Sequence, residues 1–293
     1  TLQAFVMPAR DGLLNAVASG NIQRAVTKAT LIQFYAQSVG FLVASVTERI
    51  GAVVIVCAQA ASLAIGAATF ASIRVPRNRL VVARQKKDGV FKSVASSFHT
   101  VRRNERMRAV VVQNVAMGTC FMGSYIVTIP LLIRDTYLGT AADLAAVNLL
   151  NCLGLVLTLG LLLFVGNIRR QGRALLLANA IGAVVLGSTG MGVSFAWFLA
   201  IIFCWGVCGG VTLSMSRTIM QEEAPEHERA RVMAFFGFSF LGAGPVGALT
   251  WGFVVDWVGP QLSLSIACAV VLVVVLALML WTRLWTMASR YRS

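Results

Sequence analysis

Long apolar segments separated by short polar ones make up most of the chain. A helix needs roughly 20 apolar residues to cross the hydrocarbon layer of a bilayer. Residues 187–192 form a glycine cluster, which indicates a turn inside one long uncharged stretch. The pattern predicts an all-α, polytopic membrane protein with the end of one helix at residues 1–9 and eight complete membrane-spanning segments. These segments cover residues 29–47, 50–73, 109–133, 141–166, 174–189, 195–216, 232–255 and 260–281.

The composition favours a membrane protein and argues against two other classes. Hydrophobic residues make up 58% of the chain and charged residues only 12%, whereas soluble domains contain about 25% charged residues. The net charge of +14 does not indicate a nucleic-acid partner, because the basic residues lie between the apolar segments rather than on one soluble face. The six cysteines lie inside apolar segments without the spacing of zinc ligands. We expect no nucleic acid, no metal and no cofactor.

The basic residues also predict the orientation of the chain. If the N-terminal side of the first complete segment is cytoplasmic and the segments alternate, 23 of the 25 Lys and Arg residues fall on the cytoplasmic side. Only Arg49 and Arg134 fall outside it. Cytoplasmic loops of membrane proteins carry such an excess of positive charge. The distribution therefore predicts a multi-pass topology with a cytoplasmic C-terminus.

The longest polar segment, residues 74–108, is a basic linker. Its second half carries Val90, Phe91, Val94, Phe98 and Val101 at helical spacing, which predicts an amphipathic helix along the membrane surface or against the bundle ends. Attraction to anionic lipid is the simplest role for it. We expect residues 1–73 to be the remainder of one bundle, residues 109–282 to form a complete six-helix bundle, and residues 283–293 to form a basic cytoplasmic tail.

An internal repeat relates the two sides of the linker. Two halves in the same orientation are the pattern of one large class of secondary transporters. Extrapolation places the start of the first half roughly 100 residues before Thr1, so we expect an N-terminally truncated form of a twelve-helix parent. At an offset of 207 the matching pairs are Arg10 and Arg217, Arg24 and Arg231, and Gly40 and Gly247, and one residue further on Gly51 matches Gly259.

Two stretches resemble the major facilitator superfamily. One runs from Ser216 to Val232 and continues in Gly242-Ala-Gly-Pro-Val-Gly247, and the other is Pro8-Ala-Arg10 with the helix after it. They are similar to the loop and eleventh helix, and to the fourth-to-fifth connection, of the branch that includes the enterobactin exporter and macrolide-type efflux proteins. The resemblance implies a monomer in the bacterial inner (plasma) membrane, with two bundles that rock around a central substrate site.

The resemblance also implies which residues control the rocking. The family's cytoplasmic signature Gly-x-x-x-Asp-Arg-x-Gly-Arg is degenerate, because Arg169 stands at the acidic position. Glycines are expected to permit close helix approach, and Pro245 is expected to bend its helix. The candidate gating and helix-bending residues are Arg170, Gly172, Arg173, Arg217, Arg231, Gly244, Pro245 and Gly247.

Polar side chains inside the apolar segments are candidates for a substrate cavity, because they are costly in a membrane unless they face a cavity or one another. The alternative is that the amides hold helices together. Trp205 lies mid-span and either lines the cavity or packs between helices. The cavity candidates are Gln33, Gln37, Gln113, Asn114, Tyr125, Asn148 and Asn151.

The acidic residues lie outside the deep parts of the eight segments, and Glu222 and Glu223 fall in a cytoplasmic segment. A coupling proton would therefore need an acid in helices that precede this chain. Asp143, three residues after Thr140, predicts a helix-capping box rather than a proton site. No hydrolase elbow, phosphate loop or zinc-protease signature is present in the sequence, so we do not expect an enzyme.

These features together predict a secondary active transporter that exports small lipophilic compounds, drugs or siderophores by alternating access. Its partners would be a small-molecule substrate, the lipid bilayer and a coupling proton. The alternative is a truncated membrane protein or scaffold that does not transport.

Overall fold

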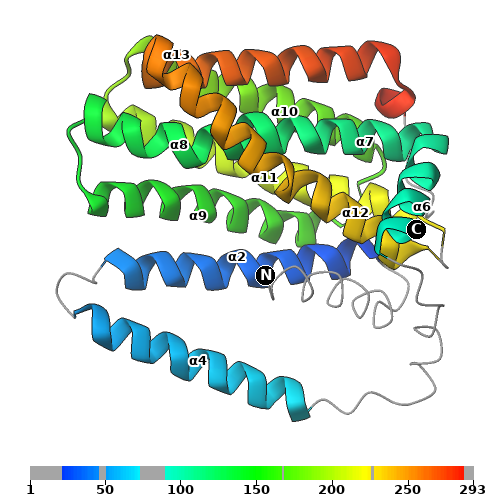
Figure 1. Ribbon diagram of the computed structural model, residues 1–293, viewed down its shortest axis with the longest axis horizontal. Coiled ribbons are helices and arrows are strands. Elements are labelled where there is room, and N and C mark those ends of the chain that lie inside the picture. Colours follow the sequence, from blue (N-terminus) through cyan, green and yellow to red (C-terminus); the bar gives the residue numbers. More distant parts are fainter. Residues whose placement is uncertain (1–21, 46–50, 73–89, 167, 226–227, 287–293) are drawn as a thin grey trace.

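The computed structural model describes residues 22–45, 51–72, 90–166, 168–225 and 228–286. Every regular element in these ranges is a helix, and most of the helices run side by side along one axis (Figure 1). The prediction of an all-α protein is confirmed. The elements are α2 (Ile22–Ser45), α4 (Ala52–Ser72), α6 (Val90–Arg103), α7 (Glu105–Ala116), η2 (Met117–Met122), α8 (Gly123–Leu131), η3 (Leu132–Thr136), α9 (Ala141–Val165), α10 (Gln171–Gly187), η4 (Ser188–Met191), α11 (Phe195–Glu223), α12 (Arg229–Leu241), α13 (Ala243–Trp281) and η5 (Arg283–Thr286).

Five helical stretches in the described ranges are long and apolar enough to cross a membrane, and a shorter apolar helix covers Val53–Thr69. The longest stretch, Arg231–Trp281, has 51 residues. At 1.5 Å per residue it would measure about 77 Å, more than twice the roughly 30 Å of hydrocarbon. Gly259, with φ of 79° and ψ of 167°, breaks it before Pro260, so each of its two arms is long enough to cross once. The described part of each of the eight predicted segments therefore lies on a separate helical arm.

Local signals in the sequence fix several of the helix ends. The carboxylate of Asp143 accepts a hydrogen bond from the backbone N–H of Thr140 at 2.7 Å, which confirms the predicted cap of α9. The glycine cluster that separates α10 from α11 ends in Gly192 with φ of 71°, a conformation that favours glycine. Asn104 caps α7 by accepting from two backbone N–H groups, so this helix begins at Glu105, four residues before the apolar segment that predicted it.

Close helix crossings hold the second bundle together. A Cβ on Gly154 would lie 2.4 Å from the carbonyl oxygen of Phe203, and one on Gly206 would lie 2.2 Å from that of Asn151. These two glycines let the backbones of α9 and α11 touch, as small residues do between membrane helices. Gly210 continues the same contact one turn further on, against the side chain of Thr158.

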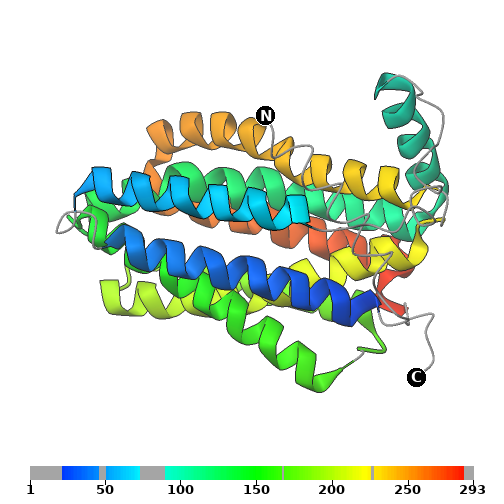
Figure 2. The ribbon, with the colours of Figure 1, turned by 90° about the horizontal axis from the view of Figure 1, so that it is seen from below.

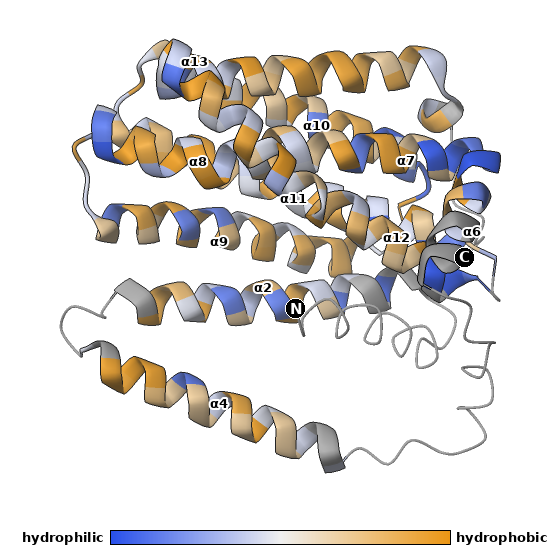
Figure 3. Cartoon of the chain, viewed as in Figure 1, coloured by the Kyte–Doolittle hydropathy of each residue, from blue (hydrophilic) through white to orange (hydrophobic). Residues whose placement is uncertain are grey.

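Three helices lie outside this bundle. α2 packs along α9 and α11, and α4 lies beyond α2, with nearly all of its described side chains exposed (Figure 1). α6 runs roughly at right angles to the long helices and projects past the bundle (Figure 2). Hydrophilic residues gather at the end of the bundle where α6 lies (Figure 3). An apolar body with one polar end suits a bilayer with α6 at its surface.

The predicted repeat has a counterpart in the structure. The repeat pairs α2 with α12 and the first arm of α13. Gly51 and Gly259, which follow them, adopt φ of 88° and 79°. Gly40 and Gly247 differ, because a Cβ on Gly40 would meet nothing within 4 Å whereas one on Gly247 would collide with the backbone at Thr119. Arg10 lies outside the described residues.

Candidate functional site

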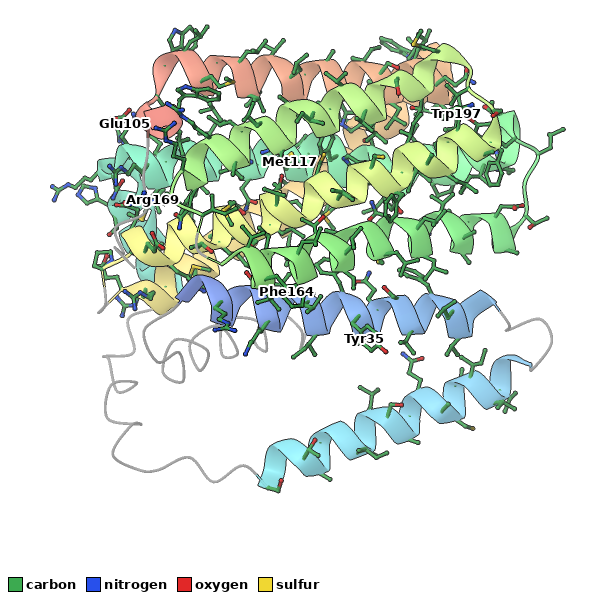
Figure 4. The ribbon with its side chains drawn as sticks, turned by 180° about the vertical axis from the view of Figure 1, so that it is seen from behind. Tyr35, Glu105, Met117, Phe164, Arg169 and Trp197 are labelled. Atoms are coloured by element: carbon green, nitrogen blue, oxygen red, sulfur yellow. The ribbon has the colours of Figure 1, made fainter. Side chains whose placement is uncertain are left out.

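One face of the helix that opens the second bundle carries Gln113, Met117, Phe121 and Tyr125 at intervals of four residues. In a regular α-helix, twelve residues make three turns plus about 120°, so Gln113 and Tyr125 would lie on different faces. The segment η2 between them is π-helical, and a π segment accommodates one extra residue. The two side chains then lie within about 20° of each other. Met117, at the start of η2, lies near the middle of the bundle (Figure 4).

Tyr125 joins two other helices in a cluster of aromatic and amide groups. Its hydroxyl donates to Oδ1 of Asn148 on α9 at 2.9 Å, and Nδ2 of Asn148 donates to the carbonyl oxygen of Leu144 at 2.8 Å. The ring of Trp205 on α11 lies 5.3 Å from that of Tyr125 and 5.6 Å from that of Phe121, nearly perpendicular to the latter. These are favourable aromatic geometries, so the cluster is held in one arrangement.

Two hydrogen-bonding groups on these helices have no partner among the described residues, one in the cluster and one twelve residues, or about 18 Å, from Tyr125 along its helix. The indole N–H of half-buried Trp205 makes no hydrogen bond there. Oε1 of Gln113, whose side chain is only 2% exposed, also has none. A buried polar atom without a partner costs free energy. The cluster therefore offers one hydrogen-bond donor beside three aromatic rings, which suits a neutral or weakly polar organic molecule.

The other cavity candidates lie in different surroundings. The side-chain amide of Asn114 donates to the carbonyl oxygen of Phe236 at 3.0 Å and to Oγ of Ser239 at 2.8 Å, so it links α7 to α12. Asn151 is half-buried where α9 crosses α11, Gln33 is half-buried on α2, and Gln37 is exposed. The structure brings Tyr125 and Asn148 together and gives Asn114 the contacts of a packing residue.

The π segment also explains a contact that the sequence did not reveal. The N–H of Gly123 bonds to the carbonyl oxygens of Gly118 and Cys120, bypassing Thr119, its partner in a regular α-helix. The Thr119 oxygen instead accepts from the indole Nε1 of Trp251 on α13 at 3.0 Å. Trp251 therefore stabilises the π segment from the neighbouring helix.

Replacing Trp251 with phenylalanine is expected to destabilise the second bundle by about 1 kcal/mol, because the buried carbonyl of Thr119 loses its donor. In a thermal unfolding experiment this corresponds to a midpoint lower by about 2–4 °C. Trp257→Phe is the matched control, since Trp257 is 88% exposed. Equal shifts for the two variants would contradict a specific role for this hydrogen bond.

At the polar end, α2 meets the second bundle through two polar contacts. Oγ1 of Thr27 and Oγ of Ser214 lie 2.9 Å apart, and Nη1 of Arg217 donates to Oγ1 of Thr30 at 3.3 Å. The gating candidate Arg217 therefore bridges the helices on either side of the linker.

Arg173 is held by the end of the chain. Its Nε donates to the carbonyl oxygen of Trp285 at 2.8 Å, and its guanidinium lies 5.1 Å from the centre of the Trp285 ring. Arg170 is exposed at the start of α10, Gly172 is buried and Arg231 is half-buried. Among the described residues, Trp285 and not a carboxylate therefore holds Arg173 of the degenerate signature in position.

The bend candidates lie where α12 gives way to α13. α12 ends at Leu241, four residues before Pro245, whose missing N–H would have bonded to that residue. A Cβ on Gly244 would lie 3.2 Å from the sulfur of Met122, and one on Gly247 would lie 2.1 Å from the oxygen of Thr119. The helix is thus interrupted at Gly242, ahead of Pro245, and Gly247 lies against η2.

A carboxylate cluster at the polar end was missed by the sequence analysis. Glu223, the last residue of α11, has a side chain only 1% exposed and pairs with Nη1 of Arg106 at 2.7 Å. Its second oxygen accepts from Asn104 at 3.1 Å, and the neighbouring Glu222 accepts from Gln171 at 3.1 Å. Glu223 therefore joins the C-terminal end of α11 to the start of α7. In the sequence, only the spacing between Glu223, an acid in a cytoplasmic segment, and Arg106, an arginine of the linker, could have suggested that the two form a pair.

The long apolar helices, the polar end and the polar groups between helices define an all-α, multi-pass membrane protein. The family model of the Major Facilitator Superfamily matches residues 2–248. The chain therefore belongs to the major facilitator superfamily, whose members are membrane transporters of small molecules and are generally not enzymes. A comparison with curated proteins gives no match.

Proposed function

We propose that this transporter exports small, lipophilic, largely uncharged compounds by alternating access, and that Tyr125, Asn148 and Trp205 contact the substrate. The observation that carries the proposal is the convergence of these side chains from α8, α9 and α11, two of which also pack along α2. Because α9 and α11 border α2, the cluster lies on helices that face the other side of the linker, where rocking bundles would alternately admit and release a molecule.

The chemistry of the cluster supports the substrate class. Aromatic rings bind apolar and aromatic molecules, and a small number of placed polar groups fixes their orientation. The indole N–H of Trp205 supplies that second element, and Oε1 of Gln113 offers an acceptor further along the same face of the helix. The candidates Gln33, Gln37 and Asn151 complete the proposed cavity, while Arg217 and Arg173 close its polar end. We further propose that the protein lies in a bacterial inner membrane with a cytoplasmic C-terminus, acts as a monomer and uses a coupling proton.

Trp205→Ala is expected to reduce efflux about tenfold, because losing a buried aromatic contact of about 1.5 kcal/mol corresponds to that factor. The measurement is the accumulation of dyes, antibiotics and siderophores in an efflux-deficient bacterium that expresses the protein from its natural reading frame. Asn148→Ala should act in the same direction, because it also removes the acceptor of the Tyr125 hydroxyl.

Trp197→Ala is the matched control. Trp197 lies eight residues earlier, near the start of the same helix (Figure 4), and is 69% exposed, so efflux should be unchanged. If Trp205→Ala and Trp197→Ala act alike, the assigned site is wrong. If the protein reaches the membrane and raises accumulation instead of lowering it, the direction of transport is reversed. No change in any flux would favour a scaffold that does not transport.

A further inference from the structure

The orientation of α6 places one of its faces toward the membrane surface. Both perpendicular views show it crossing the direction of the long helices at one end of the bundle (Figures 1 and 2). Arg103, its last residue, lies six residues before Ala109, where the apolar segment of the next helix begins. The helical residues from Glu105 to Ala109 span about 6 Å, and each headgroup layer is roughly 5–8 Å thick. The C-terminal end of α6 therefore lies at the level of lipid phosphates.

The two sides of α6 differ in chemistry. Ser97 and Val101 are buried, and Oγ1 of Thr100 donates to Glu228 at 2.6 Å. The opposite side exposes His99, Arg102 and Arg103. Neither arginine pairs with a carboxylate within the ranges that the structure describes. One side is thus fixed to the protein, and the other presents two adjacent guanidinium groups.

We propose that the exposed face of α6, through Arg102 and Arg103, binds the phosphate headgroups of anionic phospholipids and thereby ties the start of α12 to the bilayer. Guanidinium groups match phosphate with paired hydrogen bonds, and basic residues beside a membrane helix attract anionic lipid. The site is distinct from the proposed substrate site and does not depend on what is transported.

The attachment of α6 explains how lipid would act on the bundle. Phe98, which is 55% exposed, packs edge to face against Phe235 on α12, with 6.3 Å between the two ring centres. Glu228, bonded to Thr100, immediately precedes α12. The buried ion pair between Arg106 and Glu223 holds the adjoining end of α11. A headgroup that restrains α6 consequently restrains the first turns of α12.

The test is a titration of the detergent-purified protein with phosphatidylglycerol or phosphatidylcholine, in which native mass spectrometry gives the Kd of the first lipid bound. Arg102→Gln/Arg103→Gln is expected to weaken phosphatidylglycerol binding about 25-fold, from about fivefold for each arginine near the surface. Phosphatidylcholine binding should not change. Both arginines are exposed, so an unchanged unfolding midpoint confirms that the variant is folded.

Arg169→Gln/Arg170→Gln is a charge-matched control, because it removes another adjacent, exposed arginine pair from the loop before α10. It should bind phosphatidylglycerol like the wild type. Equal weakening by the two double variants would overturn the α6 site in favour of general attraction to a basic surface. Displacement of the lipid by free glycerol phosphate would overturn a membrane ligand in favour of a soluble phosphate.

Hydrogen exchange tests the link to α12. In bilayer discs that contain phosphatidylglycerol, the backbone amides of residues 228–235 should exchange more slowly than in discs of phosphatidylcholine alone. Arg102→Gln/Arg103→Gln should abolish that difference. If the wild type exchanges equally in the two lipids, α6 does not restrain α12.

Discussion

Replacing Gly247 with alanine is expected to prevent the second bundle from folding stably. The new methyl group would lie 2.1 Å from the carbonyl oxygen of Thr119 and 2.7 Å from its carbonyl carbon. These are backbone atoms and cannot rotate away, so α13 would have to move off η2. We expect a loss of more than about 3 kcal/mol, seen as little folded protein by size-exclusion chromatography and a strongly lowered unfolding midpoint.

Gly252→Ala provides the control for this prediction. Gly252 lies five residues further along the same helix, and a Cβ there would meet nothing within 4 Å. Alanine is also the better helix former by about 1 kcal/mol, so this variant should be as stable as the wild type or slightly more stable. A folded Gly247→Ala protein with an unchanged midpoint would show that the two helices do not touch at this point.

Replacing Arg106 with methionine is expected to destabilise the protein by about 2 kcal/mol. Removing one partner of a buried ion pair costs about 3–5 kcal/mol because it leaves an uncompensated charge. The side chain of Arg106 is 38% exposed, whereas that of Glu223 is 1% exposed. Solvent at the arginine reduces the loss. Chemical or thermal unfolding in detergent measures it.

A second substitution separates the charge effect from lost packing. Arg106→Met/Glu223→Met removes both charges, so it should be more stable than Arg106→Met alone. Arg134→Met is the comparison for an exposed pair, because Arg134 and Asp135 are 72% and 47% exposed, and it should leave the unfolding midpoint nearly unchanged. A double variant no more stable than Arg106→Met would rule out an unpaired buried charge as the cause.

Much of the fold could be predicted from the sequence because the bilayer imposes one simple length. Each apolar segment of roughly 20 residues corresponds to a helical arm, and the glycines at 192 and 259 mark turns that need positive φ. Helix starts were harder to predict. α7 begins at Glu105 rather than near Ala109 because Asn104 satisfies its first backbone N–H groups. A hydropathy profile does not reveal such a helix cap.

The candidate site was only partly predictable. Gln113 and Asn114 are neighbours with the same chemistry, yet one has an unpartnered buried oxygen and the other bonds to α12. The angular position of each side chain around the helix axis decides between such roles. The π segment η2 shifts that position by about 100° relative to a regular helix. Glu223 was assigned to a cytoplasmic segment because its sequence neighbours are charged. Its burial results from tertiary packing between α7 and α11.

The turn at Gly259 also bears on how this protein is made. Between Arg231 and Arg283 the chain contains one charged residue, Asp256, which is exposed beside that turn. The two arms on either side of Gly259 can therefore leave the ribosome and enter the bilayer as one hairpin, with a single carboxylate to translocate. Even at the centre of a spanning helix an aspartate costs only about 3 kcal/mol during insertion. The apolar residues of the two arms outweigh that cost, so this hairpin can insert without help from the segments before it.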